Sequence, residues 1–173
     1  INDADTLLYE KITVPLADLA EMSISFQQTR LNLLLAVTSK DEKDIQSAWD
    51  ALKQLRQKTG EKADKFEKTI LTDEGRKLFA EFKESRKVYG NFIDKIKELD
   101  DAKKDEEALA LLRGDARKAA LHEQELLNRL LESKEAQAKK TSETNDATAS
   151  RAGWTMIGAA VCGSILAFVL GLI

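Results

Sequence analysis

Several residue types are scarce in this sequence, and each scarcity excludes a kind of structure. The chain of 173 residues contains one cysteine, one histidine and one proline. Because Cys162 stands alone, no intrachain disulfide can form, and because His122 stands alone, no pair of histidines can share a metal ion. A single proline and the absence of turn-forming clusters are typical of a protein built from long helices.

The patterns that accompany catalysis are also missing. No segment has the pattern of a strand, and no glycine-rich phosphate-binding loop is present. His122 lies beside charged residues, which is typical of a solvated surface histidine. We therefore expect no enzymatic activity, no catalytic residue, no metal site and no cofactor. Basic and acidic residues are mixed along the chain, with a net charge of -3, so no nucleic acid partner is expected.

One segment stands out by what it contains. The last 20 residues, Trp154–Ile173, carry no charged side chain. As a helix they would span about 30 Å, which is the thickness of the hydrocarbon core of a bilayer. Trp154 suits the headgroup region at the edge of the bilayer, and Arg151 lies just outside it. The sequence therefore predicts a transmembrane helix in residues 151–173, which leaves residues 1–150 as one domain.

The remaining chain carries four amphipathic patterns separated by short polar links. In the first pattern, the inward positions from Ile12 to Val37 are spaced alternately by four and three residues, as in a left-handed helical bundle. Pro15 is expected to kink or loosen the beginning of this helix, and Thr72 offers a hydroxyl that can cap the third. The predicted helices cover residues 4–38, residues 45–70, residues 78–99, and a last stretch that begins near residue 105, passes Gly114 and continues into the membrane segment.

These patterns predict an all-α fold: an antiparallel up-down-up-down four-helix bundle followed by a transmembrane helix. Because the fourth helix leads to the membrane, the first helix must begin at the same membrane face. A membrane helix that precedes Ile1 would complement this arrangement.

Arg30 breaks the apolar pattern of the first helix. It occupies an inward position near Phe26 and Leu33, where an unpaired charge is costly. Two explanations are open at this point. Arg30 could be a structural residue that pairs with a carboxylate of the bundle or extends to solvent, or its planar guanidinium could hold a carboxylate ligand or a subunit partner.

Three parts of the chain resemble a known family when they are taken together. They are Tyr9 with Pro15 and Arg30 in the first helix, the segment ILTDEGRKLFAEFKESRKVYGNF from Ile70 to Phe92, and the segment EEALALLRGDARKAA from Glu106 to Ala120. Their order and spacing, followed by a long helix into a membrane segment, resemble the sensor domain of the methyl-accepting chemotaxis proteins, the bacterial chemoreceptors.

The resemblance implies a homodimeric sensor in the bacterial inner membrane, with residues 1–150 periplasmic or extracellular. It implies a first membrane helix before Ile1, and a HAMP linker with a cytoplasmic signalling rod after Ile173. Cytoplasmic signalling partners would then bind only regions absent from this chain. The ligand would bind near the membrane-distal end, between the first and fourth helices across the dimer interface.

The resemblance also indicates a binding site. Arg30 and Thr29 match the ligand-binding stretch of the first sensor helix of the family. Leu35 and Ser39 stand where aspartate-binding members have further arginines, so the identity of the ligand stays open beyond a small molecule, expected to be an organic acid. With two residues from the start of the fourth helix, the candidate ligand-binding residues are Arg30, Thr29, Arg113 and Asp115.

Two other architectures would produce the same patterns. A chain that ends in its only membrane helix could be a tail-anchored cytosolic coiled-coil adaptor. The same four-helix sensor could also be attached to a histidine kinase or a cyclase. Residues beyond Ile173 would distinguish these possibilities.

Overall fold

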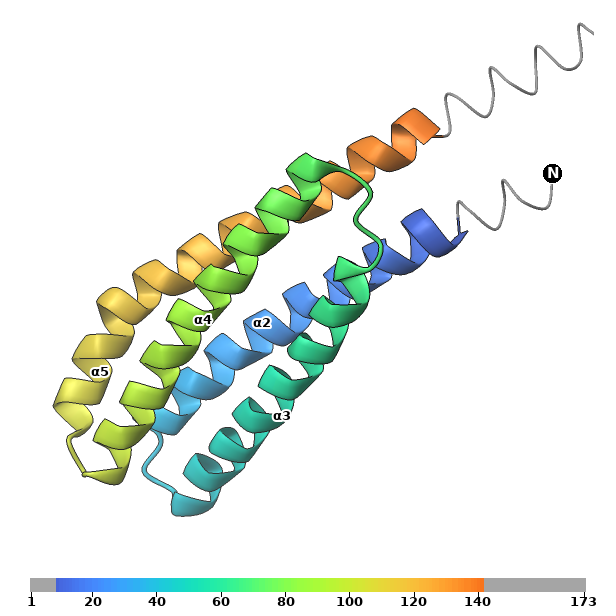
Figure 1. Cartoon of the computed structure of the whole chain (residues 1–173). Coiled ribbons are helices and arrows are strands. Elements are labelled where there is room, and N and C mark those ends of the chain that lie inside the picture. Colours follow the sequence, from blue (N-terminus) through green and yellow to red (C-terminus); the bar gives the residue numbers. More distant parts are fainter. Residues whose placement is uncertain (1–8, 142–173) are drawn as a thin grey trace, which may run out of the picture.

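The computed structural model describes residues 9–141, which form an antiparallel bundle of four helical rods (Figure 1). The all-α fold predicted from the sequence is confirmed. The transmembrane helix predicted in residues 151–173 lies outside the described residues. The elements are η1 (Tyr9–Thr13), α2 (Val14–Thr38), α3 (Glu42–Glu67), α4 (Asp73–Asp101), α5 (Asp105–Arg113) and a helix that covers residues 115–141.

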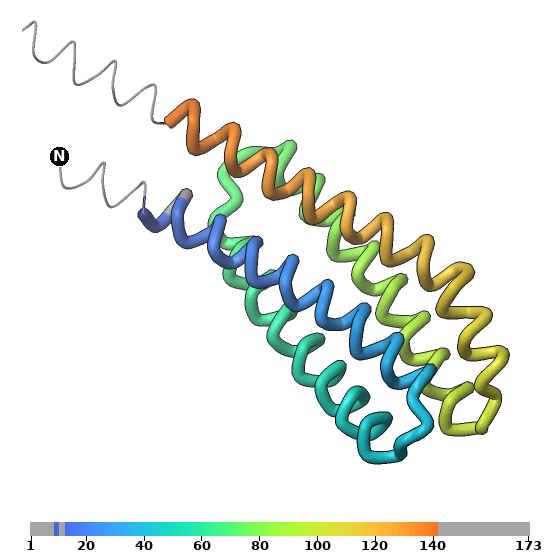
Figure 2. The backbone as a smooth tube through the Cα atoms, turned by 180° about the vertical axis from the view of Figure 1, so that it is seen from behind, coloured from blue at the N-terminus to red at the C-terminus, as the bar shows by residue number. Residues whose placement is uncertain are grey.

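The two ends of the described chain lie at the same end of the bundle. Figures 1 and 2 show the α2–α3 and α4–α5 connections together at the opposite end, and the α3–α4 connection beside residues 9 and 141. This is the up-down-up-down topology that the sequence predicts. Arg30, near the end of α2, therefore lies toward the end with two connections, far from residues 9 and 141.

Pro15 lies in the first turn of α2, directly after the five-residue π-helical turn η1. Proline has no backbone donor, and its ring clashes with the carbonyl four residues earlier in a regular helix. A wider π turn before it relieves that clash. The loosening expected at Pro15 is thus located in η1.

The fourth rod is interrupted once, whereas the sequence predicts one continuous helix past Gly114. Gly114 has φ -94° and ψ -107°, outside the helical region, and the helix resumes at residue 115. The amide of Gly114 still donates to the carbonyl of Ala110 at 2.9 Å. A Cβ atom at Gly114 would lie 3.0 Å from that same carbonyl oxygen, so the absence of a side chain allows this close approach.

Two helix starts have the caps that their sequences indicate. Thr72 Oγ1 accepts a hydrogen bond from the amide of Gly75 at 3.0 Å, which confirms the predicted cap of α4. Asp41 Oδ1 accepts one from the amide of Lys43 at 2.8 Å at the start of α3. These side chains satisfy amides that the first turn of a helix leaves without partners.

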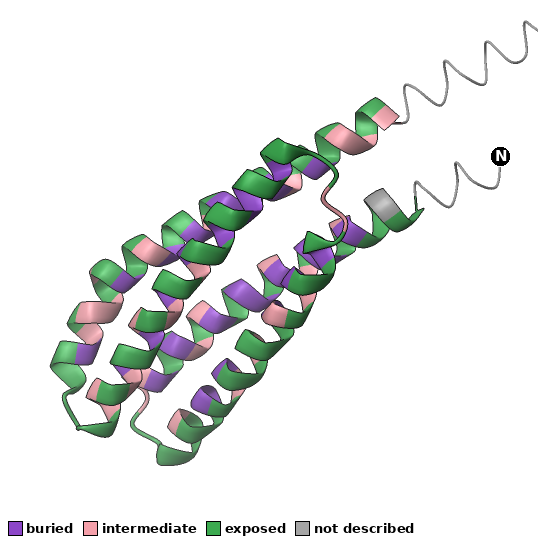
Figure 3. Ribbon diagram, in the orientation of Figure 1, coloured by how far each residue is buried: buried purple, intermediate pink, exposed green. Residues whose placement is uncertain are grey.

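The buried residues form stripes along the rods (Figure 3), and most of them are apolar. Phe79 lies between Phe66 and Phe82, with ring centroids 5.6 Å and 5.8 Å away. Two of the buried charged residues have clear partners: Lys62 reaches Asp18 at 2.8 Å, and Lys134 donates to the carbonyl of Thr69 at 3.0 Å. The buried polar residues are Asp18, Ser25, Thr29, Thr59, Ser85, Glu123 and Lys134.

Candidate ligand-binding site

The first candidate site is a surface cavity of about 310 Å³ beside α2, called here the Arg30 cavity. It lies where α2 approaches α5 and the following helix. Its cationic residues are Arg30, Arg113 and Arg117, and Leu31 and Leu34 form part of its apolar wall. No carboxylate is among the described residues that line it.

Arg30 is half-buried and is held by neutral partners. Its Nη1 donates to Oε1 of Gln27 at 3.2 Å and to Oε1 of Gln124 at 3.1 Å. The guanidinium carbon lies 5.8 Å from the centroid of the Phe26 ring. Within residues 9–141 Arg30 forms no ion pair at 4.0 Å or less. Its hydrogen bonds are therefore partly satisfied, while its charge has no countercharge in contact.

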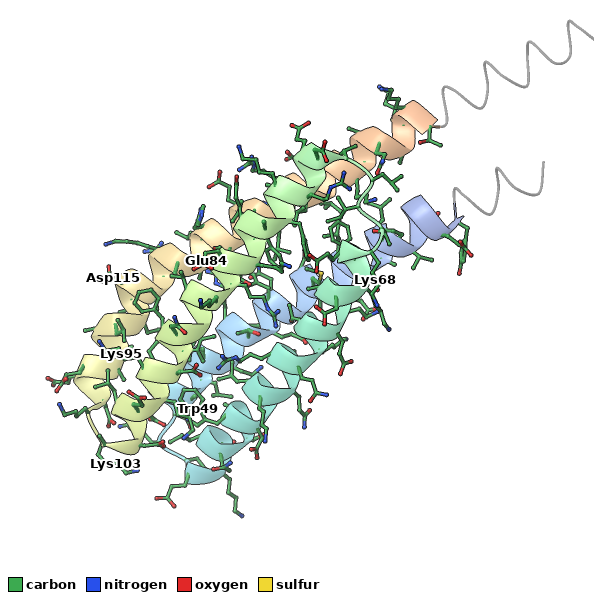
Figure 4. The ribbon with its side chains drawn as sticks, in the orientation of Figure 1. Trp49, Lys68, Glu84, Lys95, Lys103 and Asp115 are labelled. Atoms are coloured by element: carbon green, nitrogen blue, oxygen red, sulfur yellow. The ribbon has the colours of Figure 1, made fainter. Side chains whose placement is uncertain are left out.

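The structure brings together two of the four residues predicted for the site. Arg113 lines the same cavity as Arg30, and Arg117, which the sequence reasoning missed, lies one helical turn further along. Thr29 is buried and faces the interior, where its Oγ1 donates to the carbonyl of Ser25 at 2.8 Å. Asp115 lies on the outer surface, paired with Lys118 at 2.9 Å (Figure 4).

Three arginines line one largely apolar hollow, and this makes it suited to an anion. Like charges that share a cavity repel one another, and a bound anion reduces that repulsion. The planar fork of arginine forms two parallel hydrogen bonds with a carboxylate. By charge and shape the arrangement suits a carboxylate with a short apolar chain against Leu31 and Leu34.

A second cavity, also of about 310 Å³, lies among the four rods and is called here the core cavity. Each rod contributes to its wall. Thr29 comes from α2, Thr59 from α3, Tyr89 from α4, and Glu123 from residues 115–141. Tyr89 also lines the Arg30 cavity, so its ring stands between the two.

Glu123 is the most unusual residue of the core cavity. Only 3% of it is exposed, and its buried Oε2 accepts no hydrogen bond from the described residues. Burial raises the pKa of Glu123 to about 7, and the positive charge of Arg86 opposes this rise. Burial in turn lowers the pKa of Arg86, against the influence of Glu123. Burial also raises the pKa of Tyr89.

The sequence carried a signal for this cavity. Glu123 falls at an inward position of the fourth helical pattern, between apolar residues such as Ala119 and Leu126. A carboxylate at such a position is as unusual as Arg30 in the first helix. In both cases the cost of burying a charge marks the residue as a candidate for a site. Arg86 has no comparable signal, because its position beside Ser85 is compatible with a solvated face.

Two kinds of feature are not found in the described part of the chain. No three His, Cys, Asp or Glu side chains of residues 9–141 are grouped so that they could hold a metal ion. None of the helices described between residues 9 and 141 combines the length and the apolar character that a membrane crossing needs.

Fold and sequence together define a helical sensory bundle. The family model described as a four helix bundle sensory module for signal transduction matches residues 1–149. The chain belongs to this family, which confirms the resemblance to the sensor domain of the bacterial chemoreceptors. No curated protein matches the chain.

Proposed function

We propose that this chain is the sensing part of a transmembrane chemoreceptor, which binds a small organic acid and passes a conformational signal across the bacterial inner membrane for chemotaxis. The observation that carries the proposal is the Arg30 cavity, which Arg30, Arg113 and Arg117 line without a carboxylate among the described lining residues. Membership in a family of sensory modules supports the signalling role.

The dimensions of the cavity favour a small ligand. Its volume of about 310 Å³ is at the lower end of the range for small-molecule sites. A short acid fits, with its carboxylate toward the guanidinium groups and its hydrocarbon part toward Leu31 and Leu34. Gln27 and Gln124 already orient Arg30, so little side-chain entropy is lost when the ligand binds.

A second copy of the chain would cover the exposed face of α2. Ile24, Leu31 and Leu35 are 56%, 66% and 43% exposed and are separated by seven and four residues, so they form one stripe along the helix. Such an apolar stripe suits a symmetric helix–helix contact in a homodimer. Leu31 also lines the Arg30 cavity, which places the proposed ligand beside the proposed dimer interface.

The topology offers a route for the signal. The Arg30 cavity is lined by residues from the last part of α2, the end of α5 and the start of the helix of residues 115–141. This helix runs from there to the opposite end of the bundle, where residues 9 and 141 lie (Figure 2). A ligand that contacts both α2 and this helix favours one relative position of the two over another. No enzymatic step is required, and residues 1–150 lie outside the cytoplasm in this proposal.

Thermal unfolding in the presence of a panel of organic acids tests the binding site. A ligand at about a hundred times its dissociation constant should raise the melting temperature by about 5 to 10 °C. Arg30→Ala should abolish the rise and leave the helical content unchanged, while Arg30→Lys should weaken it because the ammonium lacks the fork.

Arg76→Ala is the matched control for this test, because Arg76 is an exposed arginine of α4 that pairs with Asp73 and lines neither the Arg30 cavity nor the core cavity. It should keep the full rise in melting temperature. If an acid raises the melting temperature of the Arg30→Ala chain as much as that of the native chain, its binding site lies elsewhere.

Sedimentation equilibrium tests the homodimer. Leu31→Glu places a charge on the α2 stripe and should weaken self-association at least tenfold, whereas Val88→Glu changes an exposed apolar residue of α4 and should not. Equal association constants for both variants would exclude the α2 stripe as the interface.

Cysteine labelling tests the location of the bundle. Lys95 is exposed on α4 (Figure 4), and a Lys95→Cys variant in intact cells should react with a membrane-impermeant thiol reagent. Labelling only after lysis would contradict the receptor proposal and support a tail-anchored cytosolic protein.

A further inference from the structure

We propose that the core cavity is a second ligand-binding site, which takes a small zwitterion whose ammonium group pairs with Glu123 and whose carboxylate pairs with Arg86. This site lies within one protomer and does not depend on the Arg30 cavity or on a dimer. Its two charged residues come from different rods, α4 and residues 115–141.

The carboxylate of Glu123 supplies the first half of the site. It lines the core cavity and is only 3% exposed. One of its oxygens is buried and has no hydrogen-bond donor among the described residues. An unpaired buried carboxylate is costly, and a donor that carries positive charge removes most of that cost. An ammonium group in the cavity is such a donor.

Arg86 supplies the second half. The hydrogen bond that its guanidinium makes within the described residues runs from Nη2 to the carbonyl of Arg56 at 2.7 Å. No carboxylate of residues 9–141, Glu123 included, lies within 4.0 Å of its nitrogens. Arg86 and Glu123, whose ionised forms carry opposite charges, therefore line one cavity without an ion pair between them, and a ligand with two charged ends can bridge them.

The other cations of the core cavity are already engaged or lie at its edge. Arg56 forms a two-pronged pair with Asp94, and Lys83 contacts Glu67 at 2.7 Å. Lys87 is exposed. Arg86 is consequently the cation best placed for the anionic end of a ligand.

Two arginines of this face lie against glycines of the facing helix. A Cβ atom at Gly60 would lie 3.4 Å from Nη2 of Arg86, and one at Gly90 would lie 3.2 Å from Nη2 of Arg56. Each guanidinium thus lies directly against the opposite helix of the α3–α4 pair. At Gly90 the absence of a side chain allows the close approach of Arg56, whereas a Cβ at Gly60 would make an ordinary van der Waals contact with Arg86.

The combination of charges selects among ligand classes. A simple acid would bring its carboxylate toward Arg86 but would leave Glu123 unpaired and add a like charge to the cavity. A simple amine would pair with Glu123 but would meet the guanidinium of Arg86 and leave it unpaired. A zwitterion pairs with both groups at once. The cavity volume of about 310 Å³ limits the ligand to a small molecule, with a short chain against Phe26 and Ile93.

A matched set of three-carbon compounds tests the proposal on the purified chain. β-Alanine carries both charges, propionate carries only the carboxylate, propylamine carries only the ammonium, and 3-hydroxypropionate replaces the ammonium by a hydroxyl. γ-Aminobutyrate adds one carbon between the charges. At saturation, β-alanine or γ-aminobutyrate should raise the melting temperature by about 5 °C, and the other three compounds should raise it by less than half as much.

Variants then separate the two cavities. Glu123→Gln and Arg86→Gln should each abolish the rise that the zwitterion produces, and Arg30→Ala should keep it. Failure of the organic-acid test at Arg30 would leave this result unaffected, so the two proposals fail separately. The core-site proposal is overturned if neither zwitterion raises the melting temperature, if propionate or 3-hydroxypropionate raises it equally, or if the Glu123→Gln chain keeps the rise.

A measurement on the native chain needs no variant. An ammonium group beside Glu123 favours the ionised carboxylate, so binding should release a proton below about pH 7, where burial otherwise keeps part of this group protonated. Calorimetric titration of the zwitterion in two buffers of different ionisation enthalpy detects the release. Binding without proton release would also overturn the assignment of the ammonium to Glu123.

Discussion

Replacement of Glu123 by glutamine removes a titratable group from the middle of the bundle and keeps its size and shape. In the native chain burial raises the pKa of Glu123 from its ordinary 4.5 to about 7, and Arg86 opposes the rise only in part. The folded state therefore holds this proton more tightly than the unfolded state does. The resulting stability is fully present below pH 4.5 and is lost as the pH rises through about 7.

The magnitude follows from the same pair of values. Each pH unit between the two pKa values corresponds to about 1.4 kcal/mol, so the native chain should lose about 3 kcal/mol of unfolding free energy across this window. That is a large fraction of the typical stability of a domain, which is about 5 to 15 kcal/mol. Glutamine does not titrate, and the Glu123→Gln chain should not show this loss.

Urea denaturation followed by circular dichroism, at a series of pH values from about 4.5 to about 8, measures the difference between the two chains. The variant should gain about 3 kcal/mol relative to the native chain as the pH rises. Any cost of burying the amide is the same at every pH and does not affect this change. Glu125→Gln, an exposed change two residues away, serves as the control.

No histidine is among the described residues that line the core cavity, so the pH dependence can be assigned to Glu123. A free energy difference between the native chain and Glu123→Gln that stays constant with pH would refute the description of Glu123 as a carboxyl group that burial keeps protonated.

Three further changes test the packing of the bundle by denaturant unfolding. Thr72→Ala removes the cap of α4 and should lower the unfolding free energy by about 1 kcal/mol, whereas Thr72→Ser should stay close to the native value. Equal stability of the native chain and both Thr72 variants would show that the cap contributes nothing. Phe82→Ala empties a fully buried position and should cost about 3 to 5 kcal/mol, and a cost below about 1 kcal/mol would contradict the packing around Phe79. Trp49→Phe removes the 2.8 Å hydrogen bond from Nε1 to Asp100 and should cost about 1 kcal/mol, whereas no loss would show that this bond is not stabilising.

The elements of the bundle could be predicted from the sequence because they depend on local information. The alternation of four and three residues identifies the inward face of each helix, and the caps at Asp41 and Thr72 depend on side chains within one turn of the amides they satisfy. The interruption at Gly114 was not predicted, because the apolar pattern continues across it without a change of phase. Periodicity records which face is buried and does not record a local break in the backbone.

The contents of the two cavities required the tertiary structure. The sequence placed Arg30 on an inward face, but only the packing of helices shows that Gln124, from a segment 94 residues away, accepts its hydrogen bond and that Arg117 lines the same cavity. Thr29 is the neighbour of Arg30 in sequence and still lines the other cavity, because successive residues of a helix point about 100° apart.

The same holds for Glu123. Its inward position can be read from the sequence, but its raised pKa depends on burial by all four rods and on Arg86 standing beyond ion-pair distance. A helical sequence pattern determines the direction in which each side chain points from the axis of its own helix. The distance between charges on different helices is decided only when the helices pack together, and that distance determines whether the charges form an ion pair or line a cavity.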